Sequence, residues 1–327
     1  MTTVQDLDGK YRLGRVLREG DRALIVAATH LALREPVIVK VLHADERDPR
    51  FAAKLRRAAR QSAAIRSAHV VRYLDVGHLT DQRPYVVMER LAGETLAERL
   101  VSRGPLPLDQ AVDVMLQTCE ALACAHVRGI VHRDLRTSNL FCTQQPDDRI
   151  MIKVLNFGTS RAVDGAGTQE DQGMTVTALA IDAPDYKAPE QIVARSKIDT
   201  RTDCWALGVI LYEMLAGVHP FASPSSQETV RRILSAELTP SARIPAEVWR
   251  VVTGCISLRR EDRWDSVAKI ADALAHAARP ETASYPSRIR QILETPITDA
   301  AAEDDVDEQA AASVSQMLEL QHKTIVS

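Results

Sequence analysis

One stretch of the chain, His132-Arg133-Asp134-Leu135-Arg136-Thr137-Ser138-Asn139, carries a carboxylate and an amide close together, and Asn156-Phe157-Gly158 follows it. The Asp134 carboxylate can accept a proton and so serve as a general base. Asn139 and Asn156 each offer one neutral amide oxygen, whereas a hard cation such as Mg²⁺ prefers charged oxygen ligands. Residue types alone therefore allow proton-transfer chemistry here, and they offer a metal ion only weak ligands at Asn139 and Asn156.

Two different patterns must position these residues. Between Tyr11 and Leu91, short strand-like runs surround one charged helical stretch. The expected strands span Leu24 to Ala28, Pro36 to Leu42 and Tyr85 to Arg90, and the expected helix spans Arg50 to Arg66. From Leu108 the spacing of apolar residues becomes helical, with Asp109 placed to cap the first helix, and it stays mostly helical to about Ala278. The pattern predicts an α+β chain with a small sheet lobe and a larger helical lobe.

The composition changes after Arg279-Pro280, where alanine, serine, threonine and acidic residues dominate. A concentrated negative block runs from Glu303 to Glu308, and such blocks are typical of disordered segments. We therefore predict an acidic, disordered tail over residues 280–327. Apolar residues near its end, including Val314 and Leu318, leave a partner-binding helix as the alternative to a weakly ordered terminus.

The overall composition favours a globular protein that acts in the cytoplasm. The chain has 327 residues, 45% hydrophobic content and a formal net charge of -3, so no basic surface for nucleic acid is expected. Its N-terminus lacks a signal-peptide pattern, and the most apolar segment, Trp205 to Gly217, is too short to span a membrane and contains Glu213. Five cysteines without metal-ligand spacing predict buried, reduced thiols.

An ordered set of motifs resembles the protein kinase family, in the style of bacterial Ser/Thr kinases of the eukaryotic-like type. The set comprises His132-Arg133-Asp134, Asn139, Asn156-Phe157-Gly158, Ala188-Pro189-Glu190, Asp203 and Arg263. The resemblance implies a bilobal fold with an N-terminal extension at residues 1–10, an N-lobe at 11–91, a C-lobe at 92–279 and ATP bound between the lobes. It also implies a buried ion pair between Glu190 and Arg263, and it identifies Asp203 as the aspartate that holds the catalytic-loop backbone.

The resemblance also assigns roles in phosphoryl transfer. Asp134 matches the catalytic base, Lys40 matches the lysine on the α- and β-phosphates, and Asn139 matches the amide on one Mg²⁺. Arg136 replaces the lysine usually found two residues after the base and still supplies positive charge. The residues expected around the nucleotide are Leu17, Gly20, Ile25, Ile38, Lys40, Glu89, Leu91, Phe141 and Asn156.

Several of these positions depart from the family pattern. Of the three glycines of the phosphate loop only Gly20 remains, because Arg18 and Ala23 occupy the matching positions of the other two. Ala58 aligns with the glutamate that pairs with the strand lysine, so that ion pair cannot form. Ile38 stands where the family has alanine against the adenine. Together with Asn156, these changes weaken the phosphate machinery at independent points.

Three hypotheses follow for the function. The leading one is a catalytically impaired pseudokinase that acts by binding a protein partner, with weak ATP binding through Lys40 and at best weakly held Mg²⁺. The second is a slow but active Ser/Thr kinase that uses Lys40, Asp134 and Asn139 on a protein substrate. The third is a scaffold that binds no nucleotide, which Ile38 and the lost glycines favour.

Overall fold

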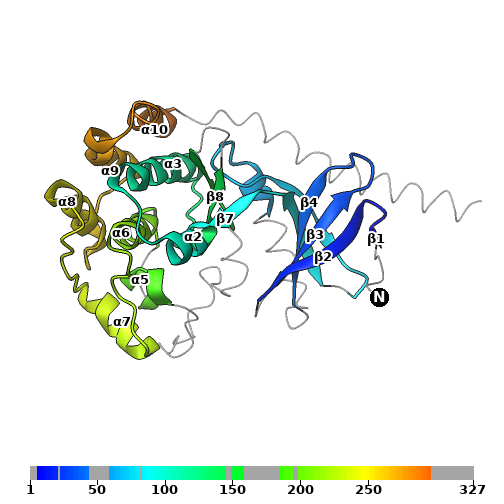
Figure 1. The fold of residues 1–327 in the computed structure, drawn as a ribbon, viewed down its shortest axis with the longest axis horizontal. Coiled ribbons are helices and arrows are strands. Elements are labelled where there is room, and N and C mark those ends of the chain that lie inside the picture. Colours follow the sequence, from blue (N-terminus) through cyan, green and yellow to red (C-terminus); the bar gives the residue numbers. More distant parts are fainter. Residues whose placement is uncertain are drawn as a thin grey trace, which may run out of the picture. The chain divides into compact units, whose positions relative to one another are not determined.

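The N-terminal lobe is a six-stranded antiparallel sheet in the order β1-β2-β3-β4-β6-β5, whose strands β1 to β4 lie side by side in Figure 1. The computed structural model describes residues 6–20, 23–43, 59–81, 83–144, 149–157, 184–193 and 198–295. The strands are β1 (Asp6–Leu7), β2 (Tyr11–Glu19), β3 (Ala23–His30), β4 (Pro36–Leu42), β5 (Tyr73–His78) and β6 (Pro84–Glu89). The three strands predicted from the sequence correspond to β3, β4 and β6.

Strand β4 shows how the sheet divides its two faces. Its buried valines, which pack beside Tyr11 and Tyr85, are Val37, Val39 and Val41. Because successive side chains of a strand alternate between faces, Ile38 and Lys40 lie on the opposite face. There Ile38 packs with Leu91 and Leu155, the residue just before Asn156. The face that carries Lys40 is therefore the one that meets the Asn156 segment.

A helical turn at residues 59–63 packs against this same face, with Ala59 buried beside Val71 and Val86. The turn lies within the helix predicted from Arg50 to Arg66, of which residues 50–58 lie outside the described residues. Ala58, the residue aligned with the family's glutamate, lies outside the described residues. The loop after the turn leads to Val70 and Val71, which pair with Val154 and so connect the N-lobe helix to the C-terminal lobe.

A three-stranded antiparallel sheet, in the order β7-β8-β9, opens the C-terminal lobe. Its strands are β7 (Gly93–Thr95), β8 (Leu140–Gln144) and β9 (Ile150–Val154). Gly93 has a φ of +143°, and a Cβ there would lie 2.0 Å from the Cys142 carbonyl oxygen, so only glycine fits. This close pairing holds the beginning of the lobe against β8, which follows Asn139 directly.

The rest of the C-terminal lobe is helical. It contains α2 (Leu96–Arg103), α3 (Leu108–His126), α5 (Pro189–Ile192), α6 (Arg201–Ala216), α7 (Ser226–Ser235), α8 (Ala246–Cys255), α9 (Val267–Leu274) and α10 (Tyr285–Glu294). Short 3₁₀ helices span Thr137–Asn139, Pro184–Tyr186, Arg260–Asp262 and Ala275–Ala277. Helix α3 begins at Leu108 as predicted, but Pro107 is its N-cap and Asp109 instead accepts hydrogen bonds from Arg279. The predicted α+β fold with a sheet lobe and a helical lobe is confirmed.

The helices surround α3 and α6, whose residues form the centre of the main apolar core. Helix α6 approaches α8 so closely that a Cβ on Gly208 would lie 2.4 Å from the Cβ of Cys255. Trp205 is fully buried and stacks on Phe221 with ring centroids 5.7 Å apart. This packing fixes α6, and with it Asp203, relative to the rest of the lobe.

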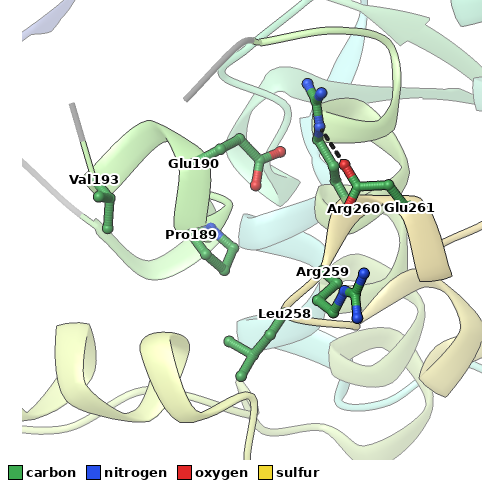
Figure 2. Close-up of a pocket in the computed structure, with 7 residues that line it drawn as sticks. All are labelled: Pro189, Glu190, Val193, Leu258, Arg259, Arg260 and Glu261. Atoms are coloured by element: carbon green, nitrogen blue, oxygen red, sulfur yellow. Dashed lines mark hydrogen bonds and ion pairs between the residues drawn. The ribbon is translucent and has the colours of Figure 1, made fainter. Parts of the chain in front are cut away.

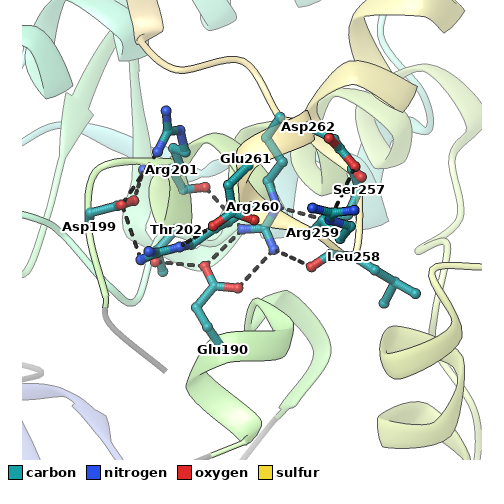
Figure 3. Close-up of polar contacts among 11 residues, drawn as sticks. Glu190, Asp199, Arg201, Thr202, Ser257, Leu258, Arg259, Arg260, Glu261 and Asp262 are labelled. Atoms are coloured by element: carbon teal, nitrogen blue, oxygen red, sulfur yellow. Dashed lines mark hydrogen bonds and ion pairs between the residues drawn. The ribbon is translucent and has the colours of Figure 1, made fainter. Parts of the chain in front are cut away.

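One charged pair is buried inside the helical lobe. Both nitrogens of the Arg263 fork donate to Glu190, across 2.8 Å in each case. Thr202 donates to the same Glu190 carboxylate across 2.9 Å (Figure 3). Burial raises the pKa of Glu190, but the hydrogen bonds and charge of Arg263 outweigh it and hold the pKa below its ordinary value. The ion pair implied by the kinase resemblance is therefore confirmed, and it anchors α5 to the loop before α9.

The prediction of a disordered tail from residue 280 is wrong for its first part. Helix α10 packs against α3 and α9 (Figure 1), and Ile289 is fully buried in the main core. Arg288 donates to Glu120 of α3 across 2.8 Å, and Tyr285 contacts His69. The sequence hides this helix because its polar residues have partners that are distant in the chain: Glu120 for Arg288, Asp272 for Arg290 and His69 for Tyr285. Residues 296–327 lie outside the described residues.

Two further features concern the molecule as a whole. Among the residues that the structure describes, no helix has both the length and the apolar character that crossing a bilayer requires. All five cysteines are buried thiols.

Candidate active site

The loop that carries Asp134 is held by one buried carboxylate. Asp203 of α6 accepts the backbone N–H groups of His132 and Arg133, each across 2.9 Å, and also the side chain of His126 across 2.8 Å. Burial raises the pKa of Asp203, yet the bonds from His126 and His132 together hold it below its ordinary value. Arg133 has a φ of +66°, which is unfavourable for a side chain with a Cβ, so these bonds stabilise a strained turn.

Asp134 itself is clamped from two sides. The ammonium group of Lys187 donates to Oδ1 across 3.1 Å, and the Asn139 amide donates to Oδ2 across 3.2 Å and to the backbone oxygen of Asp134 across 2.7 Å. Burial raises the pKa of Asp134, but the charges of Lys187 and His132 outweigh it and hold the pKa below its ordinary value. The carboxylate is therefore ionised at neutral pH, in the form that a proton acceptor requires.

Five side chains form one continuous hydrogen-bonded chain across the site. Lys40 donates to Asn156 Oδ1 across 3.1 Å, and Asn156 Nδ2 donates to Asn139 Oδ1 across 2.8 Å. Asn139 then donates to Asp134, whose other oxygen accepts from Lys187. An ammonium group thus stands at each end, two amides and one carboxylate lie between them, and strand β4 is tied to the catalytic loop.

The segment around Asn156 is fixed by its backbone and by Phe157. Asn156 has a φ of +64°, a left-handed conformation that asparagine and aspartate adopt more readily than most residues. Phe157 is fully buried and packs edge-on against His132, with ring centroids 4.7 Å apart. Its backbone oxygen accepts a hydrogen bond from the hydroxyl of Ser62, within the helical turn at residues 59–63. The exchange of aspartate for asparagine at 156 therefore changes the charge of the site and preserves its shape.

The structure brings part of the expected nucleotide-contacting set together. Ile25 lies directly opposite Lys40 in the β3–β4 pairing, and Ile38 shares the Lys40 face of β4. Leu91 packs in the same cluster as Ile38, at the point where the chain leaves β6 for β7. One cation and three apolar side chains therefore lie along one side of the sheet.

The other members of that set have separate environments. Leu17 lies on β2 with 41% of its surface exposed, and Gly20 closes the β2–β3 turn by donating its N–H to the Ala23 carbonyl across 3.0 Å. Glu89 is tied into the structure, since its carboxylate accepts from Lys153 across 2.9 Å and from the Arg72 backbone across 3.0 Å. Phe141 lies on β8 and contacts the Gly93 region, so it belongs to the second sheet.

Comparison with known proteins agrees with this geometry. The protein kinase domain family matches residues 11–277. The chain belongs to the protein kinase family. It is 32% identical over 310 residues to the serine/threonine-protein kinase PknB of Mycobacterium tuberculosis, which covers 92% of this chain and 48% of that protein. It is 34% identical over 271 residues to the serine/threonine-protein kinase Pkn1 of Myxococcus xanthus, which covers 81% of this chain and 38% of that protein.

The alignment with PknB covers more of this chain than the family match does. A third relative, the serine/threonine-protein kinase pkn3 of Myxococcus xanthus, is 31% identical over 261 residues, or 78% of this chain and 47% of that protein. The chain spans about half the length, or less, of the relatives that it matches. The family match ends at residue 277, so helix α10 lies beyond it.

The magnesium ion that kinases use does not fit the donors in this kinase domain. Kinases hold the metal with the aspartate of the Asp-Phe-Gly motif and the catalytic-loop asparagine. Here both positions are neutral amides, and the two amide oxygens already accept hydrogen bonds from Lys40 and from Asn156. The Lys40 ammonium beside Asn156 also repels a divalent cation. The site offers Mg²⁺ neither the charge nor the open oxygens that it prefers.

A nucleotide fits the same residues better than the metal does. Lys40 supplies a partly buried ammonium group, and Ile25 and Leu91 supply apolar surface on the same side of the sheet. These are the two kinds of surface that phosphates and a purine base need. A bound nucleoside triphosphate would supply the phosphate anions, while these residues would orient its phosphates and base.

Sequence reasoning missed Lys187 in this kinase domain. Arg136, the residue expected to supply positive charge near Asp134, does help to lower the pKa of Asp134, and its guanidinium lies over the Tyr186 ring, 5.6 Å from the centroid. The cation in contact with the Asp134 carboxylate is Lys187, from the segment just before Ala188-Pro189-Glu190. A lysine in a loop gives no motif signal, so only the fold reveals this contact.

A separate hollow of about 350 Å³ lies on the surface of the C-terminal lobe. It is lined by Pro189, Glu190, Val193, Leu258, Arg259, Arg260 and Glu261, as Figure 2 shows. None of these seven residues belongs to the predicted site, and Arg260 is paired with Asp199 and Glu261. The hollow is therefore a feature of the packing between α5 and the loop before α9.

Proposed function

We propose that this chain is a cytoplasmic pseudokinase, a protein-kinase-like signalling domain that binds nucleotide weakly, does not transfer phosphate efficiently, and acts through a protein partner. The single observation that carries the proposal is the pairing of Asn156 with Asn139 and Lys40. In an active kinase this place holds a metal ion bound by a carboxylate. Here two neutral amides and an ammonium group occupy it. Buried reduced cysteines favour a reducing compartment.

The physical argument concerns charge. Phosphoryl transfer depends mainly on positioning the phosphates and neutralising their charge, and the metal is the largest contributor to that neutralisation. Asp134 is retained and ionised. A general base contributes little, however, when the phosphate is not held in line with the hydroxyl that attacks it. Removing a single neutral transition-state donor in other enzymes lowers the rate about 10² to 10³-fold, and losing the metal ligand should cost at least as much.

A slow, active Ser/Thr kinase is the second candidate. It is favoured by the intact catalytic loop, in which Asp203 holds the His132 and Arg133 backbone and Asp134 faces Lys187. Such a kinase would transfer the γ-phosphate of ATP to a protein hydroxyl using Lys40, Asp134 and Asn139. A scaffold without nucleotide is the third, favoured by the branched side chain of Ile38 on the Lys40 face.

Two measurements separate these candidates. The first is the thermal midpoint of the protein with millimolar ATP, with Mg²⁺, with Mn²⁺ and with EDTA, because a ligand that binds the native state raises the midpoint. We expect ATP to raise the midpoint to the same extent with and without metal. The second is transfer of labelled phosphate to the protein itself and to a generic substrate, with Asp134→Asn as the control.

The outcomes discriminate clearly. No midpoint shift with ATP under any condition would favour the scaffold. Phosphate transfer by the natural chain that Asp134→Asn abolishes would overturn the pseudokinase and establish the slow kinase. Metal-independent stabilisation without transfer is the result that the proposal requires.

A further inference from the structure

Lys187 occupies a defined place beside Asp134. Its ammonium nitrogen lies 3.1 Å from Oδ1 of Asp134 and 3.4 Å from the backbone oxygen of Arg133. The Lys187 side chain is 14% exposed, whereas that of Asp134 is 31% exposed, so the carboxylate keeps an open side that the lysine does not cover. Lys187 thus lies beside a carboxylate that is partly exposed.

The segment that carries Lys187 is anchored on both sides of it. On one side, the Tyr186 hydroxyl is hydrogen-bonded to Thr137 across 2.8 Å and contacts Glu213 of α6. On the other, Gln191 donates to the backbone oxygen of Arg133 across 2.7 Å, and its amide oxygen accepts the Ala188 N–H across 3.0 Å. Because the backbone is held before and after residue 187, the ammonium group is positioned by the fold.

The chemistry of phosphoryl transfer places a phosphate close to this ammonium. A base must lie within about 3 Å of the hydroxyl from which it accepts a proton, and the hydroxyl oxygen lies about 3 Å from the phosphorus that it approaches. The last phosphoryl group of a nucleoside triphosphate bound in this geometry is therefore within roughly 6 Å of the Asp134 carboxylate. Lys187, on the same carboxylate, is within reach of its oxygens.

The opposite end of the hydrogen-bonded chain carries the other cation. Lys40 is joined to Lys187 through Asn156, Asn139 and Asp134, with donor–acceptor distances between 2.8 and 3.2 Å. In an active kinase the bridging metal would neutralise the phosphates between these ends. Here the side chains between the two ends do not fit a metal, so the ammonium groups of Lys40 and Lys187 are positive charges available to a phosphate, in addition to the charge of Arg136 near Asp134.

We propose that Lys187 is a second phosphate-binding cation of this domain and makes it select nucleoside triphosphates over diphosphates without a metal ion. The inference rests on the nucleotide site of the proposed function. Lys40 lies on the side of the sheet and binds the phosphates that both nucleotides have. Lys187 lies beside the general base Asp134 and binds only the third phosphate. Arg136, which stacks on Tyr186, has a structural role in this assignment.

The test compares ATP and ADP in EDTA, using isothermal titration calorimetry on the full chain. The variants are Lys187→Gln, which keeps a hydrogen-bond donor and removes the charge, and Lys187→Arg, which keeps the charge. Lys269→Gln is the matched control, because Lys269 forms an equivalent lysine–aspartate pair with Asp265 on the exposed surface at α9. The ratio of the ATP and ADP affinities does not change when part of the protein is unfolded, because both affinities are measured on the same folded fraction.

The expected result is a natural chain that binds ATP more tightly than ADP. Lys187→Gln should weaken ATP binding by about tenfold or more and change ADP binding less than about twofold, because one charge-assisted contact is lost. Lys187→Arg and Lys269→Gln should keep the natural ratio. If Lys187→Gln does not fold because Asp134 loses its partner, the double variant Asp134→Asn with Lys187→Gln removes both charges and should show the same loss of preference.

Other results would overturn the inference in distinguishable ways. An unchanged ATP-to-ADP ratio in Lys187→Gln, in a natural chain that binds both nucleotides, refutes the role of Lys187 and leaves the nucleotide site intact. A natural chain that binds neither nucleotide refutes this inference together with the nucleotide-binding part of the proposed function. Phosphate transfer is measured separately, so it decides between pseudokinase and kinase without affecting this test.

Discussion

Asn156 donates its amide hydrogen to Asn139 across 2.8 Å, so the two side chains that a kinase directs at metal ions are bonded to one another. The left-handed backbone of Asn156 is one that aspartate also tolerates, and the position therefore differs from the family in charge alone. This relationship makes the consequence of restoring the charge predictable.

Asn156→Asp should make nucleotide binding depend on metal. The new carboxylate would lie beside Lys40 and Asn139 and supply the charged oxygen that Mg²⁺ requires. With Mg²⁺ present, we expect the variant to bind ATP about tenfold more tightly than in EDTA, a difference of about 1.4 kcal/mol. Thermal midpoints measured with ATP in both conditions test this.

The control for that variant is Asn156→Gly, which relaxes the strained backbone without adding charge. It should respond to ATP equally with and without Mg²⁺, as we expect of the natural chain. If the aspartate variant also showed no effect of Mg²⁺, the lost carboxylate would not be the reason for metal independence, and the eroded loop around Gly20 would become the next explanation.

The buried ion pair gives a prediction about stability. Arg263→Met leaves the Glu190 carboxylate buried without its cation, and breaking such a pair costs about 3 to 5 kcal/mol. In a domain of this size the thermal midpoint should fall by about 10 °C. Arg231→Met is the matched control: Arg231 pairs with Glu228 on the exposed surface of α7, where solvent screens the charges and the pair contributes little to stability.

The same ion pair predicts that the domain loses stability at acid pH. The pKa of Glu190 is lowered in the folded state, so the stabilisation by Arg263 is present above the ordinary carboxyl pKa and is lost as the pH falls through the lowered value. The gap in midpoint between the natural chain and Arg263→Met should therefore narrow on acidification. A gap that stayed constant down to the acid transition would show that Arg263 stabilises the fold through packing on Trp205 rather than through its charge.

Much of the fold follows from local patterns in the sequence. The alternation in Pro36 to Leu42 predicts β4 at the bounds that the structure has, and helix α3 begins at Leu108 as its spacing indicates. The start of α3 was harder to interpret, because Asp109 resembles a cap and in fact pairs with Arg279. Helix α10 escaped prediction because Arg288 and Tyr285 have partners on α3 and at His69, which are distant in sequence.

The site residues that belong to a motif with a known role are predictable from the sequence. Those brought to the site only by the fold are not. The motifs identify Asp134, Asn139 and Asn156, and the structure joins them in one hydrogen-bonded chain. Lys187 stands in the run Tyr186-Lys187-Ala188-Pro189-Glu190, but the kinase resemblance gives it no role, since its contact with Asp134 depends on how residues 184–191 dock against the catalytic loop. Long-range contacts of this kind leave no periodic trace in the sequence.

His69 makes the domain sensitive to pH above the carboxyl range. Burial lowers the pKa of His69 from 6.5 to about 4, with smaller contributions from Arg288 and Lys153. Below pH 6.5 the unfolded chain therefore takes up a proton that the folded chain refuses until about pH 4, so folding stability falls across this interval, by about 3 kcal/mol in total. His69→Asn, which retains an amide donor for the Ile152 carbonyl, should lose stability at pH 7.5 and show a flatter profile.

Chemical denaturation at half-unit steps between pH 7.5 and pH 4.5 would measure this effect. The free energy of unfolding should fall more steeply in the natural chain than in His69→Asn. If the stability profiles of the two proteins ran parallel, the proton would be taken up by a group other than His69. His219 would be replaced next, because burial also lowers its pKa to about 4.

Helix α10 should be an integral part of the folded domain, although the family match ends at residue 277. The neutral His69 ring donates from Nδ1 to the Ile152 carbonyl, so its Nε2 must accept the Tyr285 hydroxyl, 2.8 Å away. The loop after His69 is bonded to Val154 of β9, which leads to Asn156. Helix α10 therefore supports the strand that positions the candidate site.

Two shortened chains test this role. A chain ending at residue 279 loses the buried Ile289 and the Tyr285 contact, and we expect its thermal midpoint to fall by more than about 10 °C, since burying one isoleucine alone stabilises by about 2 to 5 kcal/mol. A chain ending at residue 295 keeps all of α10 and should melt within about 2 °C of the full chain. If both shortened chains melted alike, α10 would contribute nothing to the domain. Ile289→Ala in the full chain then separates the core contact from the hydrogen bond, because it leaves Tyr285 and His69 in place.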